Sequence, residues 1–305
     1  MKLAESILGL IGDTPMVKLR SGSRSAEIWV KLEYFNPSGS HKDRIALEMV
    51  LDAEERGVLK PGGLIVEATS GNTGVSLALV GAARGYRVKL VMPDNVSRSK
   101  VELCRALGAE VVFCPHDVGE EDPRHFIHVA RRIAEEEGGY YTNQDANPAN
   151  VRAHYKTGAE IWEQTQGRVD AFVMGVGTGG TLTGVSRYIK RLKEEVLSAG
   201  VLVEGSYLAR EILGSRRELR EEIEGLASRL KPENLDRSVV DEFYEVSFRE
   251  AVSEARRLMK QGVLAGVSTG ANMAVARKLA EKLGPGKLIV TIAADSALRY
   301  PGILV

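Results

Sequence analysis

A lysine stands where a helix is predicted to begin, which is an unusual place for a cation. Lys42 follows a turn-rich run, residues 36–40, and precedes an amphipathic stretch that starts at Asp43. The positive end of the helix dipole disfavours a protonated amine there, and partial burial would lower the pKa of the amine. Because Schiff-base chemistry requires a neutral amine, Lys42 is a candidate nucleophile. An ordinary surface amine is the alternative.

A glycine-rich loop in the second half of the chain is a candidate phosphate site. It has the sequence Gly-Val-Gly-Thr-Gly-Gly-Thr over residues 175–181, directly after an apolar run that ends at Met174. Its backbone N–H groups and the dipole of the following helix can converge on a dianion, and a side chain would hold a phosphate away from the backbone. The spacing also satisfies the GxGxxG string of dinucleotide-binding folds. However, no acidic residue ends a strand about 20 residues later, where it would bind a ribose. A turn that serves packing alone is a further alternative.

A loop in the first half combines hydroxyl and amide groups at the start of another predicted helix. It has the sequence Glu-Ala-Thr-Ser-Gly-Asn-Thr-Gly over residues 67–74. Hydroxyls and N–H groups at a helix start can bind a carboxylate, which the helix dipole favours. Capping the helix would need only one of Thr69, Ser70 and Asn72. The polar residues around Gly71 exceed that need, so the loop is a candidate carboxylate site.

Short apolar runs alternate with amphipathic stretches along the chain, which predicts parallel α/β sheets. Strands are expected at residues 64–66, 89–92, 110–113, 171–174 and 288–292. Helices are expected at residues 43–55, 73–84, 99–107, 123–137, 181–195, 249–261 and 271–283. Several of these helices end at glycines suited to a left-handed C-terminal residue, namely Gly57, Gly85, Gly108, Gly138, Gly262 and Gly284. Residues 205–237 are rich in arginine and glutamate, which predicts an exposed helix and loop.

Length and composition favour a two-domain cytoplasmic protein. The 305 residues suit two α/β domains, and each half of the chain contributes one glycine-rich loop. Lys+Arg and Asp+Glu both number 41, so no net charge favours nucleic acid or an anionic membrane. The longest apolar runs are too short to span a bilayer, and we expect no secretory leader. Cys104 and Cys114 are the only cysteines, and we expect both to pack as small apolar side chains.

Together these segments resemble the fold-type II pyridoxal-phosphate enzymes of the cysteine synthase and cystathionine β-synthase group. The resemblance covers nearly the whole chain. Its motifs are Ile-Gly-Asp-Thr-Pro at 11–15, Lys-Leu-Glu-Tyr-Phe-Asn-Pro at 31–37, the Lys42 segment, Thr-Ser-Gly-Asn-Thr at 69–73, Gly-Thr-Gly-Gly-Thr at 177–181, Leu-Asp-Arg at 235–237 and Asp295. It implies an α/β fold of two open twisted sheets with flanking helices, like that of the tryptophan synthase β subunit, with the active site in the interdomain cleft. We expect a smaller domain over residues 36–147 and a larger one over residues 1–35 plus 148–305.

The matching positions imply roles for individual residues. Lys42 would form the Schiff base with pyridoxal 5′-phosphate, Asn72 would hydrogen-bond its 3′ oxygen, and Ser268 would face its pyridine nitrogen. The residues implied to bind its phosphate are Gly177, Thr178, Gly179, Gly180 and Thr181. The residues implied to bind the carboxylate of the amino-acid substrate are Thr69, Ser70, Gly71, Thr73 and Gln144. A neutral hydroxyl at Ser268 would leave the ring unprotonated and favour elimination at the β carbon over transamination. No metal is implied.

Four stretches depart from the family pattern. The stretch of residues 154–158 is one residue shorter than the corresponding stretch of the family, which would alter the floor of the phosphate site. Gly205 stands where the family usually has a proline. His41 replaces an apolar residue and either lines the cleft or is an ordinary packed or solvated neighbour. Residues 225–230 replace the small, glycine-rich residues that face the cleft in acetylserine-using members. Within this stretch Arg229 either pairs with the phosphate of O-phosphoserine or is an ordinary solvated arginine.

The predicted function is formation of L-cysteine from sulfide and an activated serine, either O-acetylserine or O-phosphoserine. The enzyme would be a transferase, with Lys42 as general base. A cystathionine β-synthase acting on serine and homocysteine is one alternative, and a serine or threonine dehydratase is another. A regulatory protein that binds a phosphate ligand is the non-enzymatic alternative. The expected partners are the amino-acid substrate, the sulfur nucleophile and a second copy of the chain in a homodimer.

Overall fold

The computed structural model describes residues 3–20, 22, 24–227, 231–300 and 302. These residues form two compact units. Unit 1 comprises the described residues of Met1–Ile11 together with Lys42–Asn150, and unit 2 comprises those of Gly12–His41 and Val151–Val305. The domain division expected from the sequence, with residues 36–147 as the smaller domain, stays a prediction.

Unit 1 contains a parallel sheet of four strands in the order β5-β4-β3-β6. Its strands are β3 (Leu64–Ala68), β4 (Arg87–Pro93), β5 (Glu110–Cys114) and β6 (Tyr140–Tyr141). Its helices are η1 (Ile7–Leu10), α1 (Lys42–Glu55), α2 (Asn72–Arg84), α3 (Arg98–Ala106) and α4 (Phe126–Glu137).

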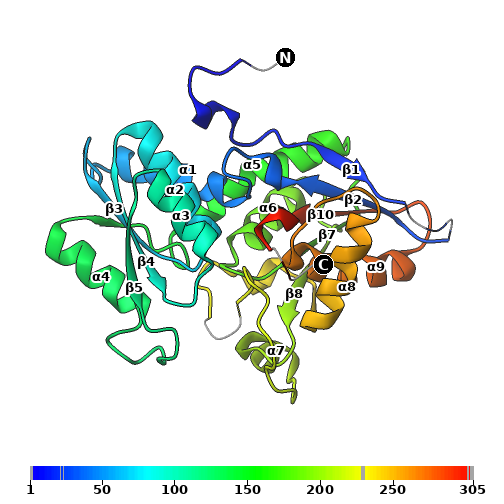
Figure 1. Ribbon diagram of the computed structural model, residues 1–305. Coiled ribbons are helices and arrows are strands. Elements are labelled where there is room, and N and C mark those ends of the chain that lie inside the picture. The colour runs from blue at the N-terminus through cyan, green and yellow to red at the C-terminus, as the bar shows by residue number, and fades with distance from the viewer. Residues whose placement is uncertain (1–2, 21, 23, 228–230, 301, 303–305) are drawn as a thin grey trace. The chain divides into compact units, whose positions relative to one another are not determined.

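Helices cover both faces of this sheet. Ile65 of β3 packs in one hydrophobic cluster with side chains of α1, α2 and α3, whereas Leu64 and Val66 pack in another with α4. Successive side chains of a strand point to opposite faces, so α4 lies on the face opposite to α1 and α2 (Figure 1). A strand that is buried on both faces has a continuous apolar sequence. This explains why the sequence pattern predicted β3.

Unit 2 contains a sheet of six strands in the order β1-β2-β10-β7-β8-β9. The strands are β1 (Met16–Lys18), β2 (Glu27–Leu32), β7 (Ala171–Gly175), β8 (Leu197–Val203), β9 (Glu242–Val246) and β10 (Leu288–Ala293). The β1–β2 pair is antiparallel, and all other neighbours in this sheet are parallel. In the described part of unit 2, the sheet is therefore parallel except for the edge strand β1, which pairs antiparallel with β2.

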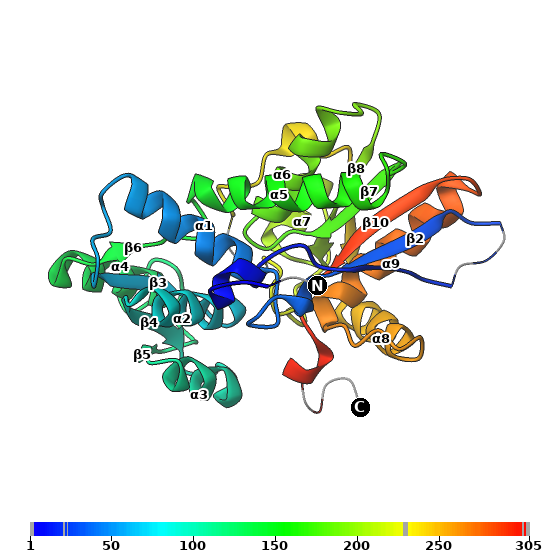
Figure 2. The ribbon, with the colours of Figure 1, turned by 90° about the horizontal axis from the view of Figure 1, so that it is seen from above.

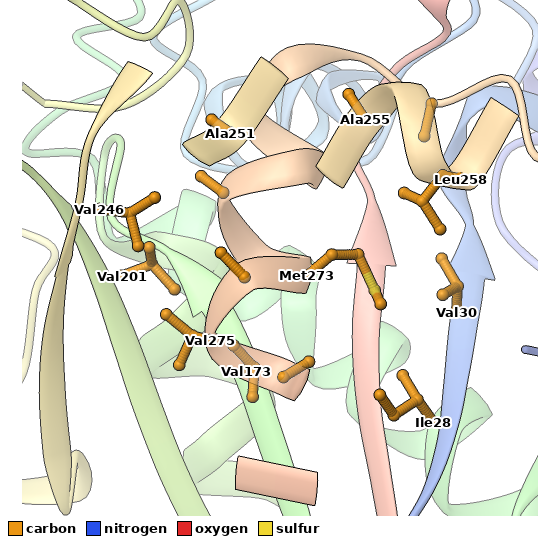
Figure 3. Close-up of a cluster of buried hydrophobic side chains, with 14 of the residues drawn as sticks. Ile28, Val30, Val173, Val201, Val246, Ala251, Ala255, Leu258, Met273 and Val275 are labelled. Carbon is orange, nitrogen blue, oxygen red and sulfur yellow. The ribbon is translucent and has the colours of Figure 1, made fainter. Parts of the chain in front are cut away.

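Helices also cover both faces of the six-stranded sheet, as Figure 2 shows. The helices are α5 (Pro148–Gln164), which starts in unit 1 and continues in unit 2, α6 (Gly180–Lys190), α7 (Tyr207–Leu213), α8 (Phe248–Met259) and α9 (Val267–Leu283). Side chains of α5, α6 and α7 pack with Phe172 and Val290 in one cluster. Those of α8 and α9 pack with Val30 and Val173 in a second cluster, drawn in Figure 3. Short 3-10 turns are η2 (Glu33–Phe35), η3 (Arg237–Val239) and η4 (Ala297–Arg299).

Most elements expected from the sequence are present. The two sheets with flanking helices confirm the predicted α/β fold, and all five predicted strands form. The six glycines predicted to end helices all have positive φ. Within residues 205–237, the described part contains α7 and irregular chain, as expected. Cys104 and Cys114 are both buried and free, in agreement with the expectation of packed apolar side chains.

Several helix ends differ from the prediction. α9 begins at Val267 rather than residue 271, which places Ser268 in its first turn. α6 ends at Lys190 rather than residue 195, because the chain turns there to enter β8. α4 begins at Phe126 rather than residue 123, after a turn held by Asp122. The sequence pattern missed α5 and the strands β1, β2, β6, β8 and β9. Among the described residues, no helix combines the length and apolar character needed to cross a membrane.

Candidate active site

Lys42 is the first residue of α1, and its side chain is buried. Burial lowers the pKa of its amine to about 8, whereas the carboxyl groups of Asp145 and Glu67 act in the opposite direction. The next residue, Asp43, ties this end of α1 to α2, because its carboxylate accepts a 2.6 Å hydrogen bond from the Ser76 hydroxyl. A buried lysine with this pKa has a large neutral fraction near pH 8. The neutral amine is the form that attacks a carbonyl carbon.

The two acidic residues near Lys42 were not predicted from the sequence. Glu67 is buried at the end of β3, and the Thr142 hydroxyl and the Gln144 backbone N–H (3.2 Å) both donate to its carboxyl group. Burial raises the pKa of Glu67 to about 8, opposed by the Thr142 hydrogen bond and reinforced by Asp145. Its carboxyl group is therefore mostly neutral below pH 8. The available signal was an acidic residue inside an otherwise apolar run.

The candidate carboxylate loop lies between β3 and α2. The Thr69 hydroxyl accepts a hydrogen bond from the Gly71 N–H (3.2 Å), and the Thr73 hydroxyl donates to the Gln144 side-chain oxygen (2.7 Å). The amide group of Gln144 also donates to the Ala68 carbonyl (3.4 Å). Gly71 stands at the N-cap of α2 without a side-chain capping bond. Capping therefore does not account for the polar residues of this loop.

The structure places the other members of the predicted carboxylate site around this network. Ser70 is exposed, and Asn72, the first residue of α2, is partly buried. Unit 1 thus gathers Thr69, Gly71, Thr73 and Gln144 at the carboxyl end of β3, and Lys42 interacts electrostatically with the Glu67 carboxyl group at the same strand end. A helix N-terminus surrounded by hydroxyl and amide groups can bind a carboxylate.

The candidate phosphate loop lies between β7 and α6 in unit 2. Gly179 has φ +81° and forms the N-cap of α6, a backbone conformation that glycine adopts without strain. A Cβ at Gly177 would lie 2.3 Å from the Gly225 carbonyl oxygen, and one at Gly179 would lie 2.6 Å from the Leu235 nitrogen. The glycines at these two positions are therefore required by the packing of the chain. The sequence argument, in which glycine keeps a side chain away from a phosphate, stays a prediction, and the packing of the chain is a second reason for glycine at these two positions.

The donors of this loop fit a dianion. The first N–H groups of a helix have no partner within the helix, and those of α6 begin at Gly180. The hydroxyl-bearing residues Thr178 and Thr181 are both buried in this segment. The loop sequence contains no acidic side chain. The N-terminal end of α6 therefore combines backbone donors, hydroxyl donors and the positive end of the helix dipole, as a phosphate site requires.

Ser268 lies in the first turn of α9 and is buried. The neighbouring Thr269 hydroxyl accepts a hydrogen bond from the Ala294 N–H (3.2 Å), and the Asn272 amide donates to the Ile292 carbonyl (3.2 Å). These bonds tie the start of α9 to the carboxyl end of β10. Ser268 is thus held at the same edge of the six-stranded sheet as the loop that follows β7.

A buried histidine contacts the phosphate loop, and the sequence gave it no role of its own. His154 lies in α5, and its Nε2 is 3.0 Å from the Thr181 hydroxyl oxygen. His41 is also buried, and its Nδ1 lies 3.3 Å from the Ala294 carbonyl oxygen. The two rings lie 6.0 Å apart between centroids. Burial excludes a solvated environment for His41, and a place in the cleft stays a prediction. The shortened 154–158 stretch was the signal that could have drawn attention to this contact.

Arg229, predicted to bind a phosphate leaving group, lies outside the described residues. The described part of its segment packs against the phosphate loop, because the Ala227 N–H donates to the Val176 carbonyl oxygen (2.8 Å). Within the described ranges, no group of three or more His, Cys, Asp or Glu side chains is arranged to hold a metal ion.

Comparison with known proteins places the chain in a family. Residues 7–295 match the family described as "Pyridoxal-phosphate dependent enzyme". The chain is 40% identical to the cysteine synthase of Dictyostelium discoideum, over 98% of this chain and 83% of that protein. It is 42% identical to the cystathionine beta-synthase of Rattus norvegicus, over 98% of this chain but only 55% of that protein's length. The solved structure of O-ureido-L-serine synthase superposes with a TM-score of 0.91 at 39% identity, covering 99% of this chain and 94% of that one.

Proposed function

This chain belongs to the family of pyridoxal-phosphate-dependent enzymes, and we propose that it forms L-cysteine from sulfide and an activated serine. The observation that carries the proposal is the buried Lys42, whose amine has a pKa of about 8. The cysteine synthase relative, which matches over nearly the whole chain, supports cysteine as the product. O-Acetylserine and O-phosphoserine are the two donors considered.

Each functional group of this chain has a proposed role toward the cofactor and the substrate. When bound, pyridoxal phosphate supplies an electron sink that acidifies the α-proton of the amino acid and lets its β substituent leave. Lys42 carries the cofactor covalently. With the amino acid bound, the neutral Lys42 amine would remove the α-proton as general base. The hydroxyl of Ser268 would face the pyridine nitrogen and, being neutral, would not hold a proton on it.

The remaining residues orient the two molecules. The loop of residues 177–181 binds the cofactor phosphate, and Asn72 donates to its 3′ oxygen. The substrate carboxylate is bound by Thr69, Ser70, Gly71, Thr73 and Gln144. The 2.7 Å bond from Thr73 to Gln144 supports a common place for these two side chains, because it joins them directly.

A second candidate function is condensation of serine with homocysteine, which the 42% identity to a cystathionine beta-synthase supports. This chain spans about half of that relative's length. The serine dehydratase alternative stays a prediction and would show as release of pyruvate from serine alone. The homodimer and the cytoplasmic location also stay predictions, and sedimentation at working concentration tests the former.

The test starts with the absorption spectrum of purified protein supplied with pyridoxal phosphate. We expect a visible band from the lysine-bound cofactor, and its loss in Lys42→Ala. Lys60→Ala is the matched control, because Lys60 is an exposed lysine of unit 1. Cysteine release is then measured with sulfide and each donor, beside cystathionine release with serine and homocysteine. A protein that takes up no cofactor, or a Lys42→Ala variant with wild-type turnover, would refute the proposal.

A further inference from the structure

The imidazole of His154 contacts a hydroxyl group at each ring nitrogen. Its Nε2 lies 3.0 Å from the Thr181 hydroxyl oxygen, and its Nδ1 lies 3.1 Å from the Thr157 hydroxyl oxygen. All three residues are at most 5% exposed. A contact network this deeply buried has a defined direction of hydrogen bonding, because each donor must meet an acceptor.

The packing of two helices makes this contact possible. A Cβ at Gly184 of α6 would lie 2.4 Å from the Val151 carbonyl oxygen and 2.7 Å from the His154 Cβ. The backbones of α5 and α6 therefore approach closely at Gly184. At this separation the His154 ring reaches the Thr181 hydroxyl in the first turn of α6.

A neutral imidazole carries one N–H, so only two arrangements of the protons are possible. With the proton on Nδ1, His154 donates to Thr157, and Nε2 accepts the hydroxyl proton of Thr181. That hydroxyl then has no proton to give to a ligand. With the proton on Nε2, His154 donates to Thr181, and Thr157 donates to Nδ1. The Thr181 proton is then available to an anion at the end of α6.

We propose that His154 is a positioning residue that holds the Thr181 hydroxyl as a donor toward the phosphate bound by residues 177–181. Thr157 completes the arrangement by donating to Nδ1, which keeps the proton of the imidazole on Nε2. This inference rests on the proposed function, because the phosphate is that of the cofactor. In the neighbouring His41 ring, Nδ1 faces the Ala294 carbonyl oxygen, which can only accept, so this nitrogen carries a proton.

The arrangement predicts the tautomer of His154. In protein labelled with nitrogen-15 at histidine, the ring nitrogen shifts distinguish Nε2–H from Nδ1–H and from the doubly protonated ring. We expect the Nε2–H tautomer in the cofactor-bound enzyme. A proton on Nδ1, or on both nitrogens, would overturn the inference without affecting the proposed function. This measurement needs no variant, so it holds even if a substitution at residue 154 prevents folding.

Substitutions test the same arrangement through cofactor affinity. We expect His154→Leu to weaken the binding of pyridoxal phosphate to the apoenzyme about threefold to tenfold, as for one misdirected hydrogen bond. His154→Gln, which keeps an N–H donor, should recover most of the affinity and the wild-type phosphorus-31 shift of the bound cofactor. Equal affinities for the leucine variant and the wild type would overturn the inference.

Thr157 of α5 has a matched control in Thr165, which directly follows the end of this helix. Thr157→Val removes the hydroxyl partner of Nδ1, so we expect the ring nitrogen shifts of His154 to change and cofactor binding to weaken. Thr165→Val should change neither, because Thr165 is a buried threonine whose hydroxyl donates to the Ile161 carbonyl. If Thr157→Val and Thr165→Val had equal effects, the role of Thr157 would be structural only, and the inference would be overturned. Failure of the wild-type protein to take up pyridoxal phosphate would overturn the proposed function together with this inference.

Discussion

The buried amine of Lys42 should cost the apoprotein stability at neutral pH. Burial lowers its pKa from 10.5 to about 8. Since one pKa unit corresponds to about 1.36 kcal/mol, this difference corresponds to about 3 kcal/mol. Lys42→Met removes the charge and keeps an unbranched side chain. We therefore expect the variant to lose activity but gain up to about 3 kcal/mol of unfolding free energy well below pH 8.

The sign follows from the direction of the pKa shift. Between about pH 8 and 10.5 the unfolded chain holds a proton on Lys42 that the folded chain has released. The free energy of unfolding of the wild type therefore rises with pH across this range. Below pH 8 the folded protein bears the full cost of the buried charge. The advantage of Lys42→Met should consequently shrink as pH rises through this range.

The assay is urea unfolding of the apoproteins at several pH values, with Lys60→Met as the control. Lys60 is exposed, so its substitution should change stability by less than about 0.5 kcal/mol. Well below pH 8 the Glu67 carboxyl group is protonated, so it does not obscure the comparison. A Lys42→Met variant no more stable than the wild type would refute the reasoning. A gain that is the same at every pH would assign the effect to apolar packing of methionine rather than to charge.

Three further changes have defined outcomes. Asp145→Asn should lower the pKa of the Lys42 amine further, because the Asp145 carboxylate raises it, and the pH dependence of cofactor attachment to the apoenzyme measures this. Gly270→Ala should lower the free energy of unfolding in urea by roughly 1 to 3 kcal/mol, because the added Cβ would lie 1.9 Å from a carbonyl oxygen of α8. Gly119→Ala is the control and should leave stability unchanged, because a Cβ there would have no atom within 4 Å. Arg229→Ala should lower kcat/KM with O-phosphoserine by a factor that corresponds to roughly 2 to 4 kcal/mol, and should hardly change kcat/KM with O-acetylserine. Equal losses with the two donors would show that Arg229 does not select the donor.

Most of the strands predicted from the sequence are those in which consecutive residues are buried and therefore apolar. β3 and β10 are buried at every position, so each has an uninterrupted apolar sequence. β2 was missed because it contains Lys31, which is fully buried. The Lys31 amine pairs with the Glu160 carboxylate at 2.7 Å and donates to the Thr14 carbonyl oxygen at 3.0 Å. These partners are distant in the sequence, so the strand resembled a polar segment.

The candidate site was predictable to the extent that it consists of short segments. Lys42 and the loops at 69–73 and 177–181 each carry their chemistry within a few consecutive residues. The Glu67 carboxyl group and His154 act through partners from other elements, Thr142 and Thr181 respectively. Neither the raised pKa of the former nor the contact of the latter follows from local sequence, because both depend on which elements fold together.

Sheet topology explains why polar loops after certain strands, and not others, are the candidate sites. In open parallel sheets, ligands bind at the carboxyl edge where the strand order reverses. In unit 1 this point lies between β3 and β6, since β4 continues on the other side of β3. The hydrogen bond from Thr73 to Gln144 joins the segments that follow these two strands.

The same argument applies in unit 2, where the order reverses between β7 and β10. The phosphate loop follows β7, and Ala294 follows β10 and donates to Thr269, the neighbour of Ser268. β4 and β8 are also followed directly by polar residues, Asp94 and Glu204, but neither strand borders a reversal. Substitution of Asp94 or Glu204 by alanine should therefore leave the KM for the amino-acid donor unchanged. A large rise in KM from either would contradict the assignment of the sites to the reversal points.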